Sequence, residues 1–176
     1  MKQLFSISFI AGIILLLFAN ASLSSCYSFR DKATLPDSIR TVRVNFIENR
    51  APYVNPQLSP TLTDRLKQKI ISQTRLTNVN TDDAHLDISG SITDYSVSTA
   101  GVTAIQGSRQ QSSINRLTVT VQLTVIRGGG TPENVTVSRP FDFSSNQTLQ
   151  QAEQALLDEI IRNVTDEIFN RIFSTW

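Results

Sequence analysis

Hydrophobic and polar residues alternate in four stretches of the chain, the pattern of β-strands that bury one face. In the first stretch Val42, Val44 and Phe46 alternate with polar residues, which predicts a strand from Thr41 to about Glu48. The alternation recurs three times, over about His85 to Val97, Arg116 to Val125 and Val135 to Phe143. Four strands are therefore expected.

Three local signals refine these strands. The apolar phase changes near Thr93 and Asp94, and since a shift of one residue exchanges the faces of a strand, a β-bulge is expected there. The third and fourth stretches flank the glycine-rich turn at 128–130, which indicates a β-hairpin. Pro140 lacks a backbone donor, which favours an edge position for the fourth strand. Residues 98–113 show no period and predict a long loop.

Two stretches have helical periodicity instead. Leu58, Leu62, Leu66 and Ile70 recur every fourth residue, which predicts a helix with Ser59 as its N-cap and an end near Thr74. A longer helix is expected from a capping box at Thr148 and Gln151 to about Phe173. Its apolar stripe is formed by Leu149, Ala152, Leu156, Ile160, Val164, Ile168 and Ile172.

These elements predict an α/β fold with the order βαβββα. The economical arrangement is a two-layer sandwich, in which both helices cover one face of a four-stranded mixed sheet. The other face, rich in Thr, Ser and Gln, is expected to remain uncovered. A single domain over residues 41–176 is expected, because a segment of this length is a usual size for one hydrophobic core.

The N-terminal segment has the organisation of a secretory signal. A positive Lys2 precedes an apolar run of 11 residues, Phe9 to Ala19, which is too short for the ~20 residues that span a bilayer. Leu23-Ser24-Ser25-Cys26 follows, resembles a bacterial lipobox and contains the only cysteine. We expect residues 1–25 to be a cleaved lipoprotein signal peptide and residues 26–40 to be a flexible tether.

The motif implies that the Cys26 sulfur carries diacylglycerol and its new amine a further acyl chain, such as palmitate. Since two acyl chains suffice for stable anchoring, this lipid would hold the domain on a membrane. An ordinary secreted protein with an incidental cysteine is the alternative.

Composition and motifs argue against an enzyme. The formal net charge is +1, which does not suggest nucleic-acid binding. The only histidine, His85, has no second His or Cys to share a metal with, so a structural role at the strand edge is favoured. Neither a nucleophile elbow nor a phosphate-binding loop occurs. The acidic pairs Asp158-Glu159 and Asp166-Glu167 are interpreted as solvated helix surface. No catalytic, metal or cofactor residues are predicted.

Four arginines are candidates for contact with anionic lipid head groups or with a partner. They are Arg50, Arg109, Arg116 and Arg127. Because they are scattered over loops and strand ends, ordinary surface charge is the competing interpretation.

Several short segments resemble the LptE-like lipopolysaccharide-assembly lipoproteins of the Bacteroidetes. They are Asn49-Arg50-Ala51-Pro52, Val54-Asn55-Pro56, Leu58-Ser59, Ser72-Gln73-Thr74, Gly90 with Ile92-Thr93-Asp94-Tyr95, Ala104-Ile105-Gln106-Gly107 and Asn115-Arg116-Leu117-Thr118-Val119. None is a catalytic signature, and their order along almost the whole mature chain carries the resemblance.

The resemblance implies a non-enzymatic outer-membrane lipoprotein that faces the periplasm. Members of the wider family plug and help to assemble the LptD-like β-barrel that inserts lipopolysaccharide, and they can bind lipopolysaccharide. The expected partners are therefore that barrel, lipopolysaccharide and, through the lipid anchor, the membrane. The alternatives are a lipoprotein activator of peptidoglycan synthesis, a secretion-associated adaptor and a periplasmic hydrolase.

Overall fold

A computed structural model describes residues 35–36, 38–104 and 111–174, all of which belong to one compact unit, Lys32–Trp176. The predicted signal peptide, the lipidation site Cys26, most of the tether and Arg109 lie outside the described residues. No helix in the described ranges combines the length and hydropathy needed to cross a membrane.

The sheet is mixed, as predicted, but it has six strands rather than four. The strand order is β3-β1-β4-β5-β6, and β2 pairs separately with β4. Their bounds are β1 Thr41–Val44, β2 Glu48–Asn49, β3 Thr77–Asn78, β4 Leu86–Ala104, β5 Gln111–Arg127 and β6 Glu133–Ser144. The two additional strands are two residues long each, too short for any alternation to reveal them.

The parallel and antiparallel parts of the sheet are segregated. β1 lies parallel to both β3 and β4, and β2 is parallel to β4. The pairs β4–β5 and β5–β6 are antiparallel. The predicted hairpin is therefore confirmed, and so is the edge position of β6, which contains Pro140. Gly128 and Gly129 form its turn with φ of 54° and 72°, a backbone region that glycine enters without steric cost.

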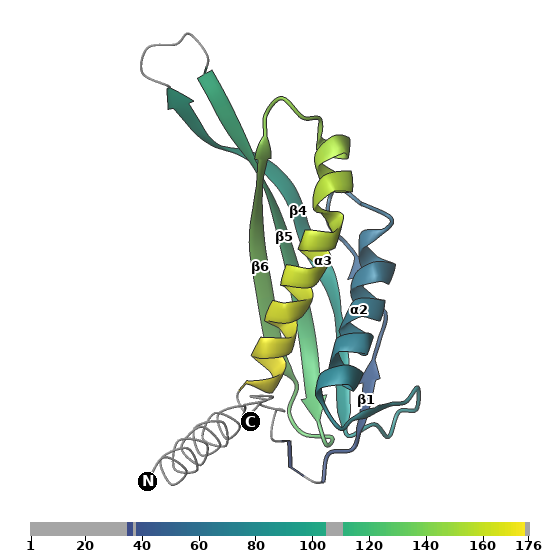
Figure 1. Cartoon of the computed structure of the whole chain (residues 1–176). Helices are drawn as coiled ribbons and strands as arrows, with labels where there is room; N and C mark the ends of the chain where they lie inside the picture. Colours follow the sequence, from purple (N-terminus) through teal and green to yellow (C-terminus); the bar gives the residue numbers. More distant parts are fainter. Residues whose placement is uncertain (1–34, 37, 105–110, 175–176) are drawn as a thin grey trace, which may run out of the picture. The chain divides into compact units, whose positions relative to one another are not determined.

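Two helices, α2 (Leu58–Gln73) and α3 (Leu149–Phe173), lie side by side on one face of the sheet (Figure 1). The capping box of α3 is confirmed, with Thr148 and Gln151 exchanging hydrogen bonds. The predicted N-cap of α2 is wrong, because the helix begins at Leu58, two residues before the start that a cap at Ser59 implies, and Gln57 occupies the cap. Asn55 performs the capping instead: its side chain accepts the N–H of Gln57 at 3.0 Å and its carbonyl accepts that of Leu58 at 3.3 Å.

The hydrophobic core fills the space between the sheet and the two helices. From the sheet it includes Val42, Val44, Leu86, Ile88, Ile92, Leu117, Val119, Val121, Leu123, Val125, Val135, Val137, Phe141 and Phe143. The helices contribute Leu58, Leu62, Leu66, Ile70, Ala152, Ile160, Ile161, Val164, Ile168, Phe169, Ile172 and Phe173. The two-layer α/β arrangement predicted from the alternating pattern is therefore present, with element order ββαββββα in place of βαβββα.

The predicted loop at 98–113 is largely strand. β4 continues to Ala104 and β5 begins at Gln111, while β6 ends opposite Ile114. Beyond that point β4 and β5 pair only with each other and extend past the end of β6 (Figure 1). The described helices do not reach this part of the two strands (Figure 1), so no buried face imposes a hydrophobic alternation on its sequence. The predicted bulge is confirmed by a register shift between Ile92 and Asp94, and a second shift lies between Thr99 and Gly101.

Candidate binding surfaces

The face of β5 and β6 opposite the helices is polar, and its side chains pair across the strands. The hydroxyl oxygens of Thr120 and Ser138 are 2.9 Å apart, and the Thr124 hydroxyl donates to Asn134 Oδ1 at 3.2 Å. Arg116 holds Asp142 with two bonds, Nε to Oδ1 at 2.7 Å and Nη2 to Oδ2 at 2.9 Å. Each pair occupies directly opposed positions in the sheet. The result is a water-compatible surface whose polar groups satisfy one another.

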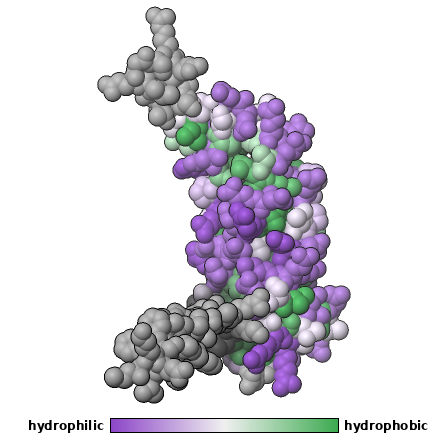
Figure 2. All heavy atoms as spheres, in the orientation of Figure 1, coloured by the Kyte–Doolittle hydropathy of each residue, from purple (hydrophilic) through white to green (hydrophobic). Residues whose placement is uncertain are grey.

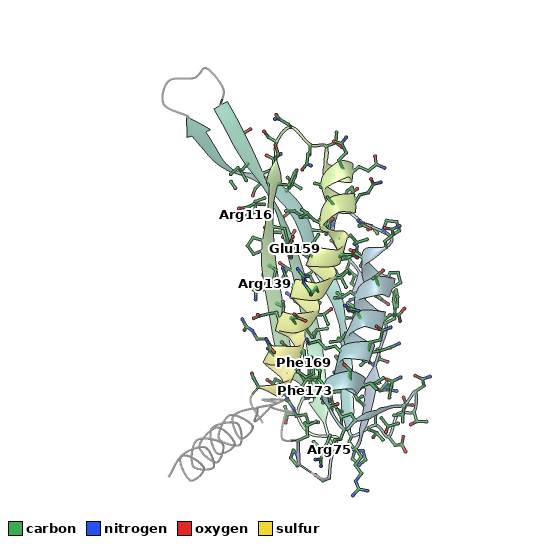
Figure 3. The ribbon with its side chains drawn as sticks, in the orientation of Figure 1. Arg75, Arg116, Arg139, Glu159, Phe169 and Phe173 are labelled. Carbon is green, nitrogen blue, oxygen red and sulfur yellow. The ribbon has the colours of Figure 1, made fainter. Side chains whose placement is uncertain are left out.

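The four candidate arginines do not form one basic patch. Arg50 follows β2 and pairs with Glu48 at 2.8 Å, whereas Arg116 and Arg127 lie eleven residues apart on β5, about 36 Å along a strand. Arg116 binds Asp142, which lowers the pKa of that carboxyl, and Arg127 binds both Glu133 and the Ile172 carbonyl. Figure 3 shows Arg116 on the upper part of the sheet and Arg139 lower down, beside α3. Arg109 is outside the described residues.

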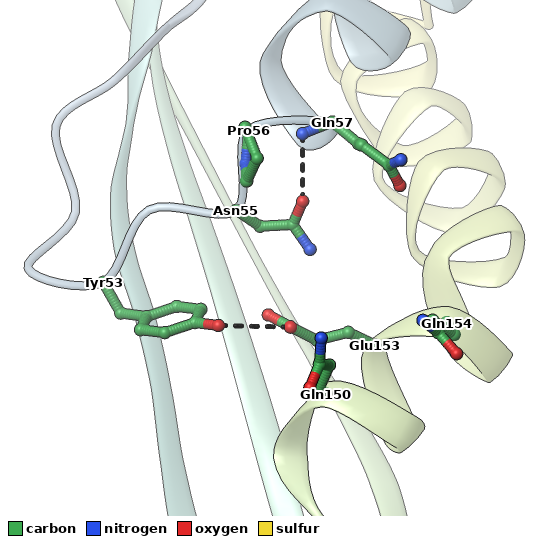
Figure 4. Close-up of a pocket in the computed structure, with 7 residues that line it drawn as sticks. All are labelled: Tyr53, Asn55, Pro56, Gln57, Gln150, Glu153 and Gln154. Atoms are coloured by element: carbon green, nitrogen blue, oxygen red, sulfur yellow. Dashed lines mark hydrogen bonds between the residues drawn. The ribbon is translucent and has the colours of Figure 1, made fainter.

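A pocket of about 500 Å³ lies where the loop before α2 meets the first turns of α3 (Figure 4). Its lining residues are Tyr53, Asn55, Pro56, Gln57, Gln150, Glu153 and Gln154. Glu153 is only 8% exposed, and its Oε2 accepts a hydrogen bond from the Tyr53 hydroxyl at 3.2 Å. The pocket thus combines a buried carboxylate, a tyrosine and several side-chain amides.

Two tyrosines support this carboxylate. The rings of Tyr53 and Tyr95 stack with 5.6 Å between centroids and 21° between planes. Burial raises the pKa of the Tyr95 hydroxyl, and the neighbouring Glu153 raises it further. The pKa of Tyr53 is raised by the same two causes, burial first. Both phenols are therefore neutral hydrogen-bond donors at pH 7, and the pocket contains no second negative charge beside Glu153.

Sequence reasoning missed Glu153, although a signal was present. Leu149, Glu153 and Leu157 follow one another at intervals of four along α3, so an acid interrupts an otherwise apolar row. A charged residue within such a row is seldom buried without a partner, which would have marked the position. No pattern in the sequence marked Asn55 as a turn residue. Its side chain accepts the Gln57 N–H, and this turn places Tyr53 beside the first turns of α3.

A second pocket, of about 350 Å³, lies between α2 and α3. Lys69 crosses it, with its Nζ 2.8 Å from Asp166 Oδ1 and 5.3 Å from the centre of the Phe169 ring. The side chains of Arg65 and Arg162 also line it. Asp166 and Glu167 are therefore not simply solvated surface, because Glu167 binds Arg139 at 2.7 Å and Arg171 at 3.0 Å. Asp158 and Glu159 are exposed on α3, as expected, and Figure 3 shows Glu159 on that helix.

The described residues contain no group of three or more His, Cys, Asp or Glu side chains arranged to hold a metal ion. His85 precedes β4 directly, and its Nδ1 lies 2.5 Å from Thr41 Oγ1, which also accepts the His85 backbone N–H at 3.0 Å. The Gly128 N–H bonds the His85 carbonyl at 2.6 Å. The histidine therefore joins β1, β4 and the β5–β6 turn, the structural role predicted for it.

The surface over the helices is largely hydrophilic, with scattered hydrophobic residues (Figure 2). Hydrophobic side chains that are exposed in the described ranges lie in loops, in α2 and in strands β4 and β5. They are Phe46, Tyr53, Val54, Ile71, Val97 and Ile114. Tyr53 lines the Glu153 pocket, and Val54 follows it in the chain.

A family model described as LptE, lipopolysaccharide-assembly, matches residues 39–172. No match was found among curated proteins.

One solved structure shares the fold at low sequence identity, and two others show a weaker similarity. A Helicobacter pylori protein described as a neuraminyllactose-binding hemagglutinin homologue has a TM-score of 0.51 and 11% identity, covering 84% of this chain and 88% of its own. The rare lipoprotein B of Shewanella oneidensis has a TM-score of 0.48 and 12% identity over 77% of this chain and 96% of its own. A minor lipoprotein of Acinetobacter baumannii has a TM-score of 0.46 and 18% identity over 78% of this chain and 95% of its own.

Proposed function

The chain belongs to the LptE family of lipopolysaccharide-assembly proteins, a non-enzymatic family, and on this premise we propose that it partners an outer-membrane β-barrel. In this proposal the protein faces the periplasm, plugs the LptD-like barrel that inserts lipopolysaccharide and supports its assembly. The observation that carries the proposal is the family match, which spans all the helices and strands of the fold except the last residue of α3.

The polar face of the sheet supports a place inside a wet barrel. Large outer-membrane barrels enclose a polar, water-filled interior, and a body that plugs one must present surfaces that tolerate water. The pairs Thr120–Ser138, Thr124–Asn134 and Arg116–Asp142 satisfy one another on the face that the helices leave uncovered. Such a face can lie against a wet wall without leaving polar groups unpaired.

Lipid anchoring at Cys26 supplies the other half of the proposal. The short apolar run followed by Leu23-Ser24-Ser25-Cys26 is the pattern of a lipoprotein precursor. Two or more acyl chains would hold the domain on the inner leaflet of the outer membrane, where a barrel partner is within reach.

Copurification tests the partnership. The full-length protein, tagged at its C-terminus and extracted from native envelopes in mild detergent, should bring down one large β-barrel in a fixed ratio. Gln122→Lys, which adds a charge to the exposed sheet face, should lower the recovery of the barrel. The matched control is Asn170→Lys, which adds the same charge on the exposed surface of α3 and should leave recovery unchanged. Absence of any β-barrel with the unaltered protein would refute the partnership.

A further inference from the structure

The Glu153 pocket holds a negative charge that the described part of the chain leaves incompletely paired. Oε2 accepts the Tyr53 hydroxyl and the neutral Tyr95 hydroxyl lies beside the same carboxylate, but buried Oε1 has no hydrogen-bond partner within the described residues. The other residues lining the pocket are one tyrosine, one proline, one asparagine and three glutamines, so no basic side chain balances the carboxylate. Burying an ion without a counter-charge is costly, and buried carboxylates are normally paired.

We propose that this pocket binds the guanidinium group of an arginine that a partner protein inserts, with Glu153 as its counter-charge. A guanidinium presents five N–H donors in a planar fork, which matches a carboxylate edge. Oε1 of Glu153 provides the free acceptor. The side chains of Gln57, Gln150 and Gln154 line the same cavity (Figure 4), and an amide carbonyl is an acceptor for guanidinium donors.

The rim of the pocket has the chemistry of a protein interface. Tyr53, which lines the pocket, is 44% exposed, and Val54, the next residue in the chain, is 54% exposed, although both are large hydrophobic residues. Tyrosine and arginine are enriched in the residues that dominate protein–protein binding, and an arginine alkyl chain packs well against an aromatic ring. A partner protein would cover these apolar surfaces at the same time as it delivers the cation.

The residues around the carboxylate are already held in place. Tyr53 stacks on Tyr95, which is 3% exposed and belongs to β4. The turn at Asn55 is fixed by its hydrogen bond to the Gln57 N–H at 3.0 Å, and Glu153 projects from a helix with a complete capping box. A preformed site loses little conformational entropy on binding, so it can recognise one side chain.

The site lies on different residues from the polar face of the sheet, so this inference does not rest on the barrel partnership. The occupant is an arginine side chain of a partner protein, and the guanidinium is the group that the pocket recognises.

Small probes test the chemistry directly on the full-length protein in detergent micelles, by NMR of the glutamine side-chain amides. N-acetyl-arginine methylamide should shift the Gln57, Gln150 and Gln154 signals saturably, with a dissociation constant of about 1–10 mM for one isolated side chain. The matched probe is N-acetyl-citrulline methylamide, which has the same shape with a neutral urea. It should bind at least about ten-fold more weakly.

Substitution then identifies the counter-charge. Glu153→Gln keeps the shape of the side chain and should raise the dissociation constant of the arginine probe at least about ten-fold. Glu159→Gln, on the exposed surface of the same helix, should leave that constant unchanged. Equal binding of the two probes, stronger binding of a neutral sugar such as glucose, or no saturable shift up to about 50 mM probe would overturn the proposal. The comparison of arginine with citrulline needs only the unaltered protein, so it decides the matter even if Glu153→Gln fails to fold.

Discussion

Gly90 is the position where two strands approach too closely for any side chain. A Cβ built there would lie 2.2 Å from the Gln122 carbonyl oxygen and 2.8 Å from the Leu123 Cα, both of them backbone atoms. Backbone in the middle of a sheet cannot move aside cheaply, because its hydrogen bonds fix it on both sides. The requirement for glycine here therefore arises from close packing.

Gly90→Ala should consequently destabilise the fold by about 1–3 kcal/mol, the usual cost of forcing an extra carbon into a packed site. Gly101→Ala is the matched control, because a Cβ at Gly101 would meet no atom within 4 Å. Urea denaturation of the two variants measures the difference. Equal stability of the two would show that β4 and β5 are not packed as closely as described.

Asp87 joins β1 to β4 through a charged pair. It receives Arg43 Nε at 3.1 Å and Nη2 at 2.8 Å, and Asn45 Nδ2 at 2.8 Å. The hydrogen bond from Arg43 is the main cause that lowers the pKa of this carboxyl below its ordinary value. A carboxyl with a lowered pKa in the folded state stabilises that state at pH values above its unfolded pKa of about 3.9, and the contribution disappears as the pH falls through the folded value.

Asp87→Asn should therefore lower the thermal midpoint at pH 7, and the difference from the unaltered protein should shrink steadily below about pH 4. Asp64→Asn, on the exposed side of α2, should show little effect at either pH. Calorimetric scans at a series of pH values from about 2 to about 7 measure the thermal midpoint of both variants across the titration of the carboxyl. A difference for Asp87→Asn that stays constant with pH would contradict the role of the charged pair.

The side chains also show where sequence patterns reach their limit. The alternation in β5 predicted its buried residues because the helices cover one face of that strand. The start signal of α2 was misleading: the Ser59 hydroxyl was expected to cap the helix but is buried without a partner in the described structure. Capping was taken over by Asn55, and only the fold of the preceding loop decides between the two residues.

At the scale of the elements, α3 has the clearest sequence signals. Its capping box, its apolar stripe and its end at Phe173 were all predicted, because each depends on residues close together in the chain. The two-residue strands β2 and β3 were not, since their hydrogen bonds come from β4 and β1, far along the sequence. The extended part of β4 and β5 escaped prediction for a different reason, namely the absence of a covering layer.

The capping box of α3 gives a quantitative test. Thr148→Ala removes the hydroxyl that accepts the Gln151 N–H and should cost about 1 kcal/mol of stability. Thr61→Ala makes the same chemical change at an exposed position within α2 and should be neutral or slightly stabilising, because alanine is the best helix former. Denaturant titration compares the two. A loss as large for Thr61→Ala as for Thr148→Ala would refute the capping role.

At the scale of the whole molecule, the predicted two-layer α/β architecture is confirmed, while the number of strands was underestimated. Burial of one face of the sheet creates the alternating pattern, so the two layers could be predicted from the sequence. The pocket around Glu153 depends on two segments about 100 residues apart meeting in space, and no local pattern specifies that meeting. Family membership rests on the match over residues 39–172.

Attachment to the membrane should depend on one atom, the Cys26 sulfur. Cys26→Ser should move the protein from the membrane fraction to the soluble periplasmic fraction or leave an unprocessed precursor, because no acyl chain can be added. Ser25→Ala keeps a small residue before the cleavage point and should remain in the membrane fraction. Envelope fractionation with mass spectrometry of the N-terminal peptide measures both, and an unmodified thiol in the mature unaltered protein would disprove the anchor.

The central claim is that this family member serves lipopolysaccharide assembly by binding, without catalysing a reaction. Depletion of the protein in its native host, followed by quantification of surface lipopolysaccharide, tests it most directly. The account predicts that surface lipopolysaccharide falls as the protein is lost and returns when the unaltered chain is restored. Unchanged surface lipopolysaccharide after complete depletion would contradict it.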